Sequence, residues 1–265
     1  MTVVTFLSDY GLEDEFVGVC HGVIARIAPA ARVIDITHGI ARHEVRSGAI
    51  VLRRALVHMP CGVHLAVVDP GVGSERRAVA LRCAGAERVL VGPDNGLLML
   101  AAERFGGVAE AVDIAASPFA LDPVAASFHG RDLFAPVAAR LASGTPLDEV
   151  GEPLDPAELV ALGIPRASIV DGVLHAHVLH ADRFGNVMLD AVGADLEACG
   201  LRPGVALTVN GVRAAYATTF ADVAPGGLLL YEDSYGAPSL AINRGSALDA
   251  LGLEIYARVQ IALDA

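Results

Sequence analysis

A carboxylate and an arginine flank a tight loop in the segment Val67–Arg77, whose sequence is VVDPGVGSERR. Asp69 follows an apolar run that is typical of a buried strand, and Pro and Gly residues then turn the chain. Glycine also allows the backbone to approach a ligand closely, and Arg76 follows on the far side of the loop. The pattern indicates a ligand site at Asp69 and Arg76, although a turn capped by its own Asp and paired with Arg fits the same residues.

A histidine precedes a glycine in the segment Ser127–Asp132, SFHGRD, where we expect a helix to begin. His129 at such a position can reach a cleft, and Asp132 in the first turn suits the helix dipole. A lone histidine is also commonly structural, and that alternative stays open for His129. Other histidines are expected to be structural by default, and the last two lack the carboxylate and spacing of a metal site: His43, His58, His64, His175, His177 and His180.

A group of acids lies ahead of the first predicted helix in the segment Ser8–Glu15, SDYGLEDE. Asp9 follows a predicted strand, and a carboxylate there can accept hydrogen bonds from both hydroxyls of a ribose. Asp14 and Glu15 are instead expected to cap the helix and complement its dipole.

The second half of the chain has weaker signals. The segment Asp182–Asn186, DRFGN, is either an ordinary turn or an aromatic platform with an amide that can read a base edge. The segments Thr218–Asp222 and Ser234–Gly236 are unspecific alone, and Gly92–Gly96 predicts a simple turn. No P-loop, GxSxG, HExxH or catalytic-cysteine motif occurs.

The composition excludes several classes of protein. A net charge of −12 without a Lys/Arg cluster argues against nucleic acid as a partner, because phosphate binding needs a basic face. No apolar run approaches the roughly 18 residues of a membrane span, and no signal-peptide pattern is present. We expect a soluble cytoplasmic protein without a membrane partner. The four cysteines form no CxxC pair and are expected to be buried free thiols.

Strands and helices are expected to alternate in residues 1–163, which we assign to an N-terminal domain. The predicted strands are 3–7, 32–37, 64–68, 79–82 and 88–91, and the predicted helices are 16–27, 44–58, 96–104 and 131–141. This alternation predicts an α/β fold with a mostly parallel central sheet. Sites in such sheets lie beyond the carboxyl ends of the strands.

Residues 164–265 are assigned to a second domain of short β-rich runs, after a proline-rich connector at 144–165. The expected strands are 173–180, 205–209, 228–231, 240–242 and 253–261, with one helix at 193–199. The dipeptide Asn210-Gly211 is a strong hairpin signal. We expect a mainly antiparallel, barrel-like domain.

Taken together, these segments resemble the SAM hydroxide adenosyltransferase family, whose members hydrolyse S-adenosyl-L-methionine (SAM) and are related to fluorinating and chlorinating enzymes. The resemblance depends on the order and joint presence of motifs in both halves: Ser8–Gly11, Asp69–Gly73, Pro93–Leu97, Phe128–Asp132, Phe184–Asn186, Thr219–Asp222 and Ser234–Gly236. It implies an N-terminal α/β domain, a C-terminal β-barrel and a homotrimer. Each active site would then combine one subunit's N-terminal domain with its neighbour's C-terminal domain.

The family's water-handling triad maps onto Asp69, Arg76 and His129. In the halogenating relatives an aromatic residue replaces Asp69 and Tyr-Ser replaces His129-Gly130, so this sequence keeps the hydrolytic pattern. The resemblance therefore implies hydrolysis of SAM to adenosine and L-methionine, with no cofactor and no metal. Whether Asp69 or His129 accepts the proton stays open.

The resemblance also implies roles for residues that bind the substrate. Asp9 matches the carboxylate that grips the ribose diol, and Asp69 is a second candidate contact to the nucleoside. The other matching positions serve the adenine, its aromatic flanks, the methionine end and the closing loop: Asn186, Phe184, Phe220, Asp182, Ser234, Ile242 and Arg244. Ser239 departs from the family, because many members carry an acidic residue there.

The sequence leaves three alternative functions open. A SAM-dependent halide transferase would give a chlorinated nucleoside, and a SAM or adenosine sensor would bind without turnover. A metal-dependent hydrolase would use the acids of the segment Asp9–Glu15.

Overall fold

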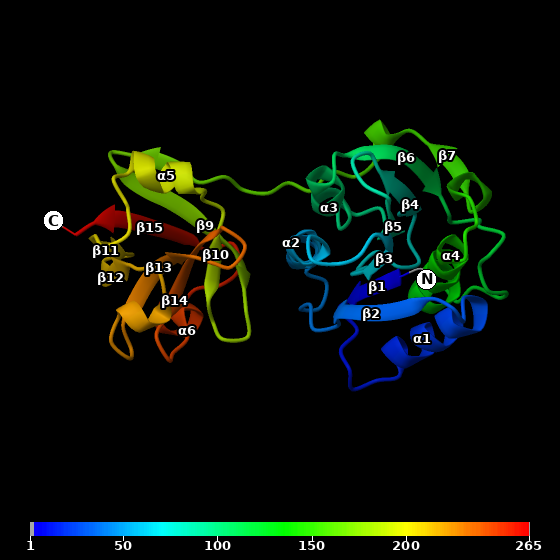
Figure 1. The fold of residues 1–265 in the computed structure, drawn as a ribbon, viewed down its shortest axis with the longest axis horizontal. Coiled ribbons are helices and arrows are strands. Elements are labelled where there is room, and N and C mark those ends of the chain that lie inside the picture. The colour runs from blue at the N-terminus through cyan, green and yellow to red at the C-terminus, as the bar shows by residue number, and fades with distance from the viewer. Residues whose placement is uncertain (1–2, 265) are drawn as a thin grey trace. The chain divides into compact units, whose positions relative to one another are not determined.

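The computed structural model describes residues 3–264 and divides into two compact units, residues 1–162 and 163–265. The first unit contains a seven-stranded sheet and the second a β-barrel (Figure 1). Each unit has its own buried apolar cluster, one built from the first sheet and its helices and one from the barrel. The α/β fold and the barrel-like second half expected from the sequence are both confirmed.

The first sheet has the strand order β2-β1-β3-β5-β4-β6-β7. The four strands from β2 to β5 pair in parallel, and β4, β6 and β7 extend the sheet by antiparallel pairing. Their bounds are β1 Val3–Ser8, β2 Arg32–Thr37, β3 Gly62–Val67, β4 Ala78–Cys83, β5 Arg88–Pro93, β6 Val108–Asp113 and β7 Glu152–Leu154. The sequence patterns did not predict β6 and β7, the antiparallel edge.

Register in the parallel half determines where two candidate residues lie. Ser8 of β1 pairs with Val67 of the adjacent β3, so the two strands end at the same level. Asp9 follows β1 directly and Asp69 lies two residues beyond the end of β3, so both are at one edge of the sheet. This edge is where parallel sheets place their ligand sites.

Helices cover both faces of the sheet, with α1 (Phe16–Ile27) and α4 (Ala135–Ala142) together on one face. On α1 the buried positions Val17, Cys20, Val23 and Ile24 recur at helical spacing and face the core. The helices α2 (Val45–Leu56) and α3 (Met99–Arg104) pack together on the other face.

The predicted helix at 131–141 begins with a π-helical turn, Gly130–Phe134, before α4 continues it. Turns of this kind inside helices are frequent at functional sites, and this one directly follows His129. Short 3₁₀ turns occur at Leu147–Glu149, Pro156–Glu158 and Phe220–Asp222.

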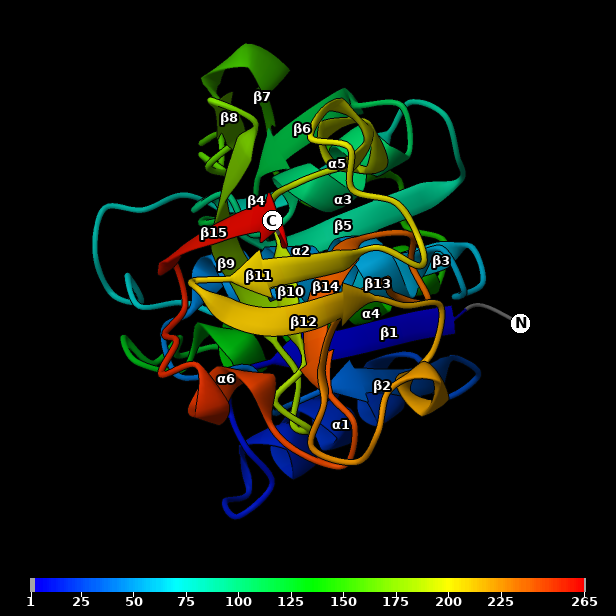
Figure 2. The ribbon, with the colours of Figure 1, turned by 90° about the vertical axis from the view of Figure 1, so that its left-hand side faces the viewer.

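The second unit closes into a barrel of the order β10-β14-β13-β12-β11-β15-β9, because β9 also pairs with β10 (Figure 2). One of these pairings, between β12 and β13, is parallel, and β8 adds to the outside of β9. The bounds are β8 Ser168–Val170, β9 Val173–Ala181, β10 Val187–Leu189, β11 Ala206–Val209, β12 Val212–Tyr216, β13 Leu228–Glu232, β14 Pro238–Ile242 and β15 Arg258–Leu263.

The hairpin predicted at Asn210-Gly211 joins β11 to β12, and both residues have positive φ, at 50° and 80°. Positive φ at both central positions is the requirement of a type I′ turn, which matches the twist of the strands. The helix α5 (Gly193–Ala198) was expected, whereas the four-residue α6 (Ala247–Ala250) was not.

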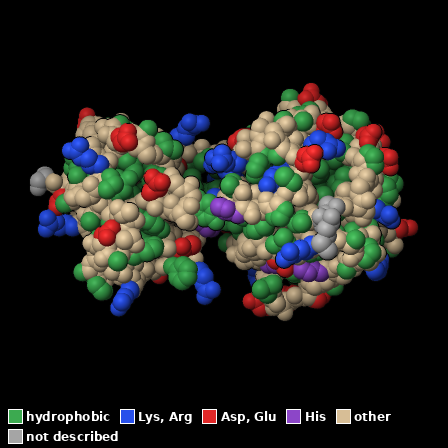
Figure 3. All heavy atoms as spheres, viewed as in Figure 1, with side chains coloured by type: hydrophobic (Ala, Val, Ile, Leu, Met, Phe, Trp, Pro, Cys, Tyr) green, Lys and Arg blue, Asp and Glu red, His purple; other side chains and the backbone are tan. Residues whose placement is uncertain are grey.

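Other surface features agree with the composition, with one exception. No helix within residues 3–264 is long and apolar enough to cross a bilayer. Acidic and basic side chains are interspersed on the face of the described molecule that Figure 3 shows. Cys20, Cys83 and Cys199 are buried free thiols, and burial raises the pKa of Cys20 to about 12. Cys61 is exposed, so the expectation of burial was wrong for that residue.

Candidate active site

The loop that follows β3 is folded tightly by its own polar groups. The carbonyl oxygen of Gly71 accepts hydrogen bonds from the Ser74 amide at 3.0 Å and the Ser74 hydroxyl at 2.6 Å. Gly73 has a φ of 78°, and a Cβ there would lie 2.8 Å from the carbonyl oxygen of Ala126. The loop therefore requires glycine where it packs against the segment that leads to His129.

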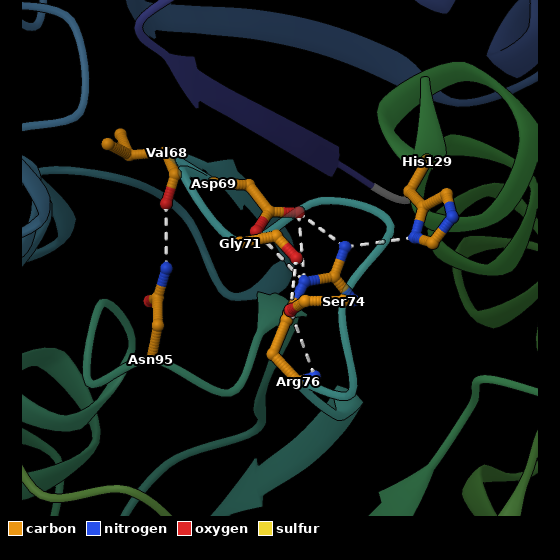
Figure 4. Close-up of polar contacts among 7 residues, drawn as sticks. All are labelled: Val68, Asp69, Gly71, Ser74, Arg76, Asn95 and His129. Atoms are coloured by element: carbon orange, nitrogen blue, oxygen red, sulfur yellow. Dashed lines mark hydrogen bonds and ion pairs between the residues drawn. The ribbon is translucent and has the colours of Figure 1, made fainter. Parts of the chain in front are cut away.

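Arg76 bridges Asp69 and His129 (Figure 4). Its Nε donates to the two Asp69 oxygens at 2.9 and 3.0 Å, and its Nη2 donates to Oδ2 and lies 2.9 Å from His129 Nδ1. The side chains of Arg76 and Asp69 are only 11% and 6% exposed, so water screens their pairing weakly. The Phe134 ring lies 5.3 Å from the guanidinium and supports it from the π-helical turn.

The contact with Arg76 assigns the protonation state of His129. An arginine has only donors, so His129 Nδ1 must accept, and the neutral ring carries its proton on Nε2. Burial and the Arg76 charge both lower the pKa of His129 below its ordinary 6.5, against the opposing effects of Asp69 and Asp132. The structure therefore favours a neutral imidazole at this position.

Arg77, the neighbour of Arg76, makes a different set of contacts. Its Nε donates to Asp94 at 2.9 Å and its Nη1 to Glu158 at 3.0 Å. Asp94 also accepts from the Val160 amide at 2.8 Å, so these residues fasten the edge of the sheet to a later segment. Of the two arginines in the motif, only Arg76 contacts Asp69.

The segment Gly92–Gly96 is more than the simple turn expected from its sequence. The Asn95 side-chain amide donates to the carbonyl oxygen of Val68 at 2.8 Å, immediately before Asp69. Asn95 also accepts from the Leu97 amide at 3.1 Å. Asn95 thus helps to hold the backbone just before Asp69. The resemblance included it in the motif Pro93–Leu97 but gave it no role.

Tyr10 is a site residue to which the sequence patterns gave no role, although it lies in the motif Ser8–Gly11. It packs edge-to-face against Phe128, with 5.9 Å between the ring centroids, and its hydroxyl lies where a Cβ at Gly130 would be. Burial raises the pKa of Tyr10 well above its ordinary value, and the charges of Asp9 and Asp69 add to this. The tyrosine therefore keeps its proton and occupies the space beside His129-Gly130.

Asp9 is oriented by the backbone of another loop. Its Oδ2 accepts from the amide of His43 at 3.0 Å, and His43 has a φ of 68°. Glu15 lies at the N-cap of α1 but makes no capping hydrogen bond with its side chain, so the capping prediction was wrong for that residue.

Asp132 is buried in the first turn after His129, where it does more than complement the dipole. It pairs with Arg131 at 2.6 Å and accepts from the Ala125 amide at 2.9 Å. The Arg131 hydrogen bond lowers the pKa of Asp132. The buried carboxylate thereby fixes the loop that leads into His129.

In the second unit, Asp182 and Asn186 close one turn. Asp182 Oδ1 accepts from the amides of Phe184 at 2.8 Å and Asn186 at 3.0 Å, and Oδ2 accepts from the Asn186 side chain at 2.7 Å. Gly185 has a φ of 76°, and a Cβ there would overlap Ser246. Phe184 projects from this turn with 70% of its surface exposed.

Two more loops lie beside the Asp182–Asn186 turn. The Gly185 carbonyl accepts from Leu248 at 3.1 Å, which places the turn against the segment that follows Ile242 and Arg244. The Asn243 side chain in turn donates to the Val223 carbonyl at 2.8 Å, next to the Phe220 turn. Six predicted binding residues are thus brought to one end of the barrel: Asp182, Phe184, Asn186, Phe220, Ile242 and Arg244. The sequence patterns did not predict Asn243 as their connector.

Ser234 lies away from this group. Glu232 pairs with Pro238 at one end of the β13–β14 hairpin, and Leu228 pairs with Ile242 at the other. Ser234 is in the turn at the first end, whereas Ile242 and Arg244 are at the second. Next to that turn, Ser239 of β14, which replaces an expected acid, is buried and donates to Asp233 at 3.4 Å. A carboxylate is therefore present at this end in Asp233.

Comparison with known proteins identifies the family. A sequence model of the SAM hydroxide adenosyltransferase N-terminal domain matches residues 4–151, and one of the C-terminal domain matches residues 176–260. The chain belongs to the SAM hydroxide adenosyltransferase family. The order of motifs in both halves predicted this membership, and the match confirms it.

The relatives of this chain include both hydrolases and halogenating enzymes. A protein of Salinispora tropica named (R)-S-adenosyl-L-methionine hydrolase is 48% identical over 97% of each chain. A fluorinase of an Actinoplanes species is 30% identical over 91% of each. The crystal structure of a conserved protein from Thermotoga maritima has a TM-score of 0.89 and 36% identity, and covers 98% of this chain and 99% of that one.

Proposed function

We propose that this chain hydrolyses SAM to adenosine and L-methionine by direct attack of water on the ribose C5′. The observation that carries the proposal is the hydrogen-bonded arrangement of Asp69, Arg76 and His129 at the carboxyl edge of the sheet, in which the Asp69 and Arg76 side chains are nearly buried. The Salinispora tropica relative, at 48% identity, is named (R)-S-adenosyl-L-methionine hydrolase. That name specifies the (R) form of the substrate. We therefore propose (R)-SAM as the substrate.

The leaving group determines what the site must do. Attack at C5′ forms a C–O bond and breaks the C–S bond, whose electron pair neutralises the sulfonium and releases methionine as a thioether. Such a group needs no protonation and no Lewis acid, and we propose that no cofactor takes part. The barrier lies in the nucleophile and its alignment, and holding two reactants in line can supply several kcal/mol, up to about 7–11.

We assign the proton of the attacking water to Asp69. The Nδ1 atom of His129 is engaged by Arg76, and burial and the Arg76 charge lower its pKa, so this ring is a poor base. The Asp69 carboxylate has lone pairs beyond those that Arg76 occupies. Arg76 then holds both side chains in place while the proton passes to Asp69 and on to solvent, and His129 Nε2–H orients the water.

Halide transfer is the nearest rival, and the same carboxylate opposes it. A dehydrated halide beside Asp69 would place two negative charges together in a site with little water screening. A sensor that binds SAM without turnover would not need the Asp69–Arg76–His129 arrangement. The acids of the segment Asp9–Glu15 do not form a group with metal-ligand spacing among the described residues, which leaves the metal-dependent hydrolase without support.

We propose the substrate contacts from where the structure places each residue. Asp9 holds the ribose diol beside Asp69, and the exposed Phe184 with Asn186 and Phe220 provides an adenine platform next to Ile242 and Arg244. We place Ser234 at the methionine end, since it lies at the opposite end of the β13–β14 hairpin. The Asp182 carboxylate is engaged within its own turn, so its proposed contact with the methionine amino group requires that turn to rearrange.

We further propose a homotrimer in which each site takes its two parts from neighbouring subunits, as the resemblance implies. The cytoplasmic location stays a prediction of the sequence.

Chromatography of the products tests the proposed activity. The protein is incubated with SAM with and without chloride, and with a chelator. We expect adenosine and methionine in equal amounts under all three conditions. A chlorinated nucleoside would support the halide transferase instead, and tight binding without product would support the sensor.

A further inference from the structure

A second group of chemically active side chains lies on the outer strand of the first sheet, and the proposed reaction does not use it. His21 is on α1, Asp35 is on β2, and His38 follows β2. Asp35 Oδ1 lies 2.8 Å from His21 Nε2 and 3.2 Å from His38 Nε2, and the ligand atoms of the three residues all lie within 4.8 Å of one another. We propose that these three residues bind a zinc ion, which fixes the end of β1 in place.

The strongest support is a buried nitrogen that lacks a partner. The His38 side chain is 2% exposed, and its Nδ1 lies 2.7 Å from the Ser8 hydroxyl. Its Nε2 makes no hydrogen bond although it lies 3.2 Å from Asp35, because the geometry is unsuitable. A buried polar atom without a hydrogen bond costs about 1–3 kcal/mol of stability, so such atoms are rare in folded proteins.

Neither neutral tautomer of His38 gives its Nε2 atom a hydrogen bond. With the proton on Nδ1, donated to Ser8, the Nε2 lone pair faces a carboxylate oxygen. With the proton on Nε2, the N–H group is close to Asp35 but misaligned. A metal ion at Nε2 satisfies the nitrogen and leaves the Nδ1–H bond to Ser8 as the support that metal-bound histidines usually have.

The type and spacing of the ligands favour zinc. Two imidazole nitrogens and one carboxylate oxygen suit Zn²⁺, whereas Mg²⁺ prefers oxygen ligands. Tetrahedral ligands at about 2.1 Å from the ion lie about 3.4 Å apart, slightly more than the 2.8 and 3.2 Å observed. His21 and Asp35 are 36% and 41% exposed, so they can move apart by this amount and leave a coordination position to water.

The position of the ion gives it a structural role. Ser8, which supports His38, also accepts from the Tyr10 amide at 3.2 Å, and the His38 carbonyl accepts from Gly11 at 2.8 Å. An ion at this point ties α1 and β2 to the segment that carries Asp9 and Tyr10. It takes no part in bond making, so the inference stands independently of the proposed reaction.

Calorimetric titration of chelator-treated protein with Zn²⁺ tests the site. We expect one ion per chain, at least about 100-fold weaker binding in His21→Ala and Asp35→Ala, and unchanged binding in the control His175→Ala, a partly buried histidine of the second unit. Co²⁺ should give the visible absorption of a tetrahedral site in the wild type only, and Mg²⁺ should not bind.

A thermal measurement keeps the test independent of activity. Zn²⁺ at about 100 times its Kd should raise the Tm of the wild type by several degrees and leave both ligand variants unchanged. Circular dichroism verifies that the variants are folded. The proposal is overturned if the wild type binds Zn²⁺ no more tightly than these variants, or if His175→Ala weakens binding equally.

Discussion

The candidate residues of the two units differ in their hydrogen bonding and in their exposure to solvent. In the first unit, the hydrogen-bonded residues Asp69, Arg76 and His129 come from separate segments. The side chains of Asp69 and Arg76 are almost completely buried. In the second, Asp182 and Asn186 are bonded within one turn, and Phe184 is 70% exposed. The difference indicates that the proton-handling groups are set before substrate arrives, whereas the binding loops offer open surface. Substitutions in the first unit should therefore lower kcat, and those in the second should raise KM.

The largest expected effect comes from Asp69→Asn. The amide keeps the shape of the carboxylate but cannot accept the proton from water, so kcat for adenosine release should fall about 10³-fold. Asp113→Asn is the matched control, because within residues 3–264 the Asp113 side chain accepts from the nearby Ala115 amide alone and should tolerate the change. An Asp69→Asn rate within tenfold of the wild type would contradict the assignment of the base.

The adjacent arginines offer a matched pair. Arg76→Lys cannot hold Asp69 through two nitrogens and also reach His129, and we expect kcat to fall about 10²-fold. Arg77→Lys affects only the pairing with Asp94 and Glu158, and its kcat should stay near the wild-type value. Steady-state rates of the two variants compare them directly, and equal losses would remove the distinction.

The space beside His129 is tested by Gly130→Ser. The new side chain would overlap the Tyr10 hydroxyl and displace the histidine, so kcat should fall about 10–100-fold. Tyr10→Phe in the same chain removes that hydroxyl and should restore part of the rate. Gly18→Ser, at an open position of α1, serves as the control. A double variant as slow as the single one would show that Tyr10 is not the cause.

In the second unit, Phe184→Ala should raise KM about tenfold and leave kcat within about twofold, since stacking on a base contributes roughly 1–3 kcal/mol. Val192→Ala, another exposed apolar position of that unit, should change neither constant. A fall in kcat with unchanged KM in Phe184→Ala would contradict the division of roles between the two units.

The smallest effect concerns pH. The neutral form of His129 is the one that accepts from Arg76, and its pKa lies below the ordinary 6.5, so it stays neutral as pH falls to 6.5. We expect kcat to hold at pH 6.5 and to decline only at lower pH. In Arg76→Gln the positive neighbour is lost, the pKa of His129 rises, and the acid limb of the residual activity should move upward. If the acid limb of the pH profile stays at the same pH in Arg76→Gln, the limb does not arise from protonation of His129.

Some of this arrangement could be predicted from sequence because it depends on local pattern. Helical spacing placed α1, and the position of Asp9 after an apolar run placed it at the edge of the sheet. The overlap between Tyr10 and a side chain at Gly130 joins distant segments, so no local pattern could show it. Asn95 was hidden because the segment Gly92–Gly96 is also typical of a simple turn.

The short elements were missed for a related reason. The strands β7 and β10 and the helix α6 have three or four residues each, too few for a period to show. They form because neighbouring strands and loops supply their partners, as β9 and β14 do for β10. The histidines of the proposed zinc site were not recognised either, because His21 and His38 come together with Asp35 only in the folded sheet.

Hydrolysis in ¹⁸O-labelled water tests the central claim most directly. Mass spectrometry of the adenosine should show one ¹⁸O atom in the 5′-hydroxyl for the wild type, with the same label but a rate about 10³-fold lower for Asp69→Asn. Adenosine without label at that position would contradict direct attack of water on C5′.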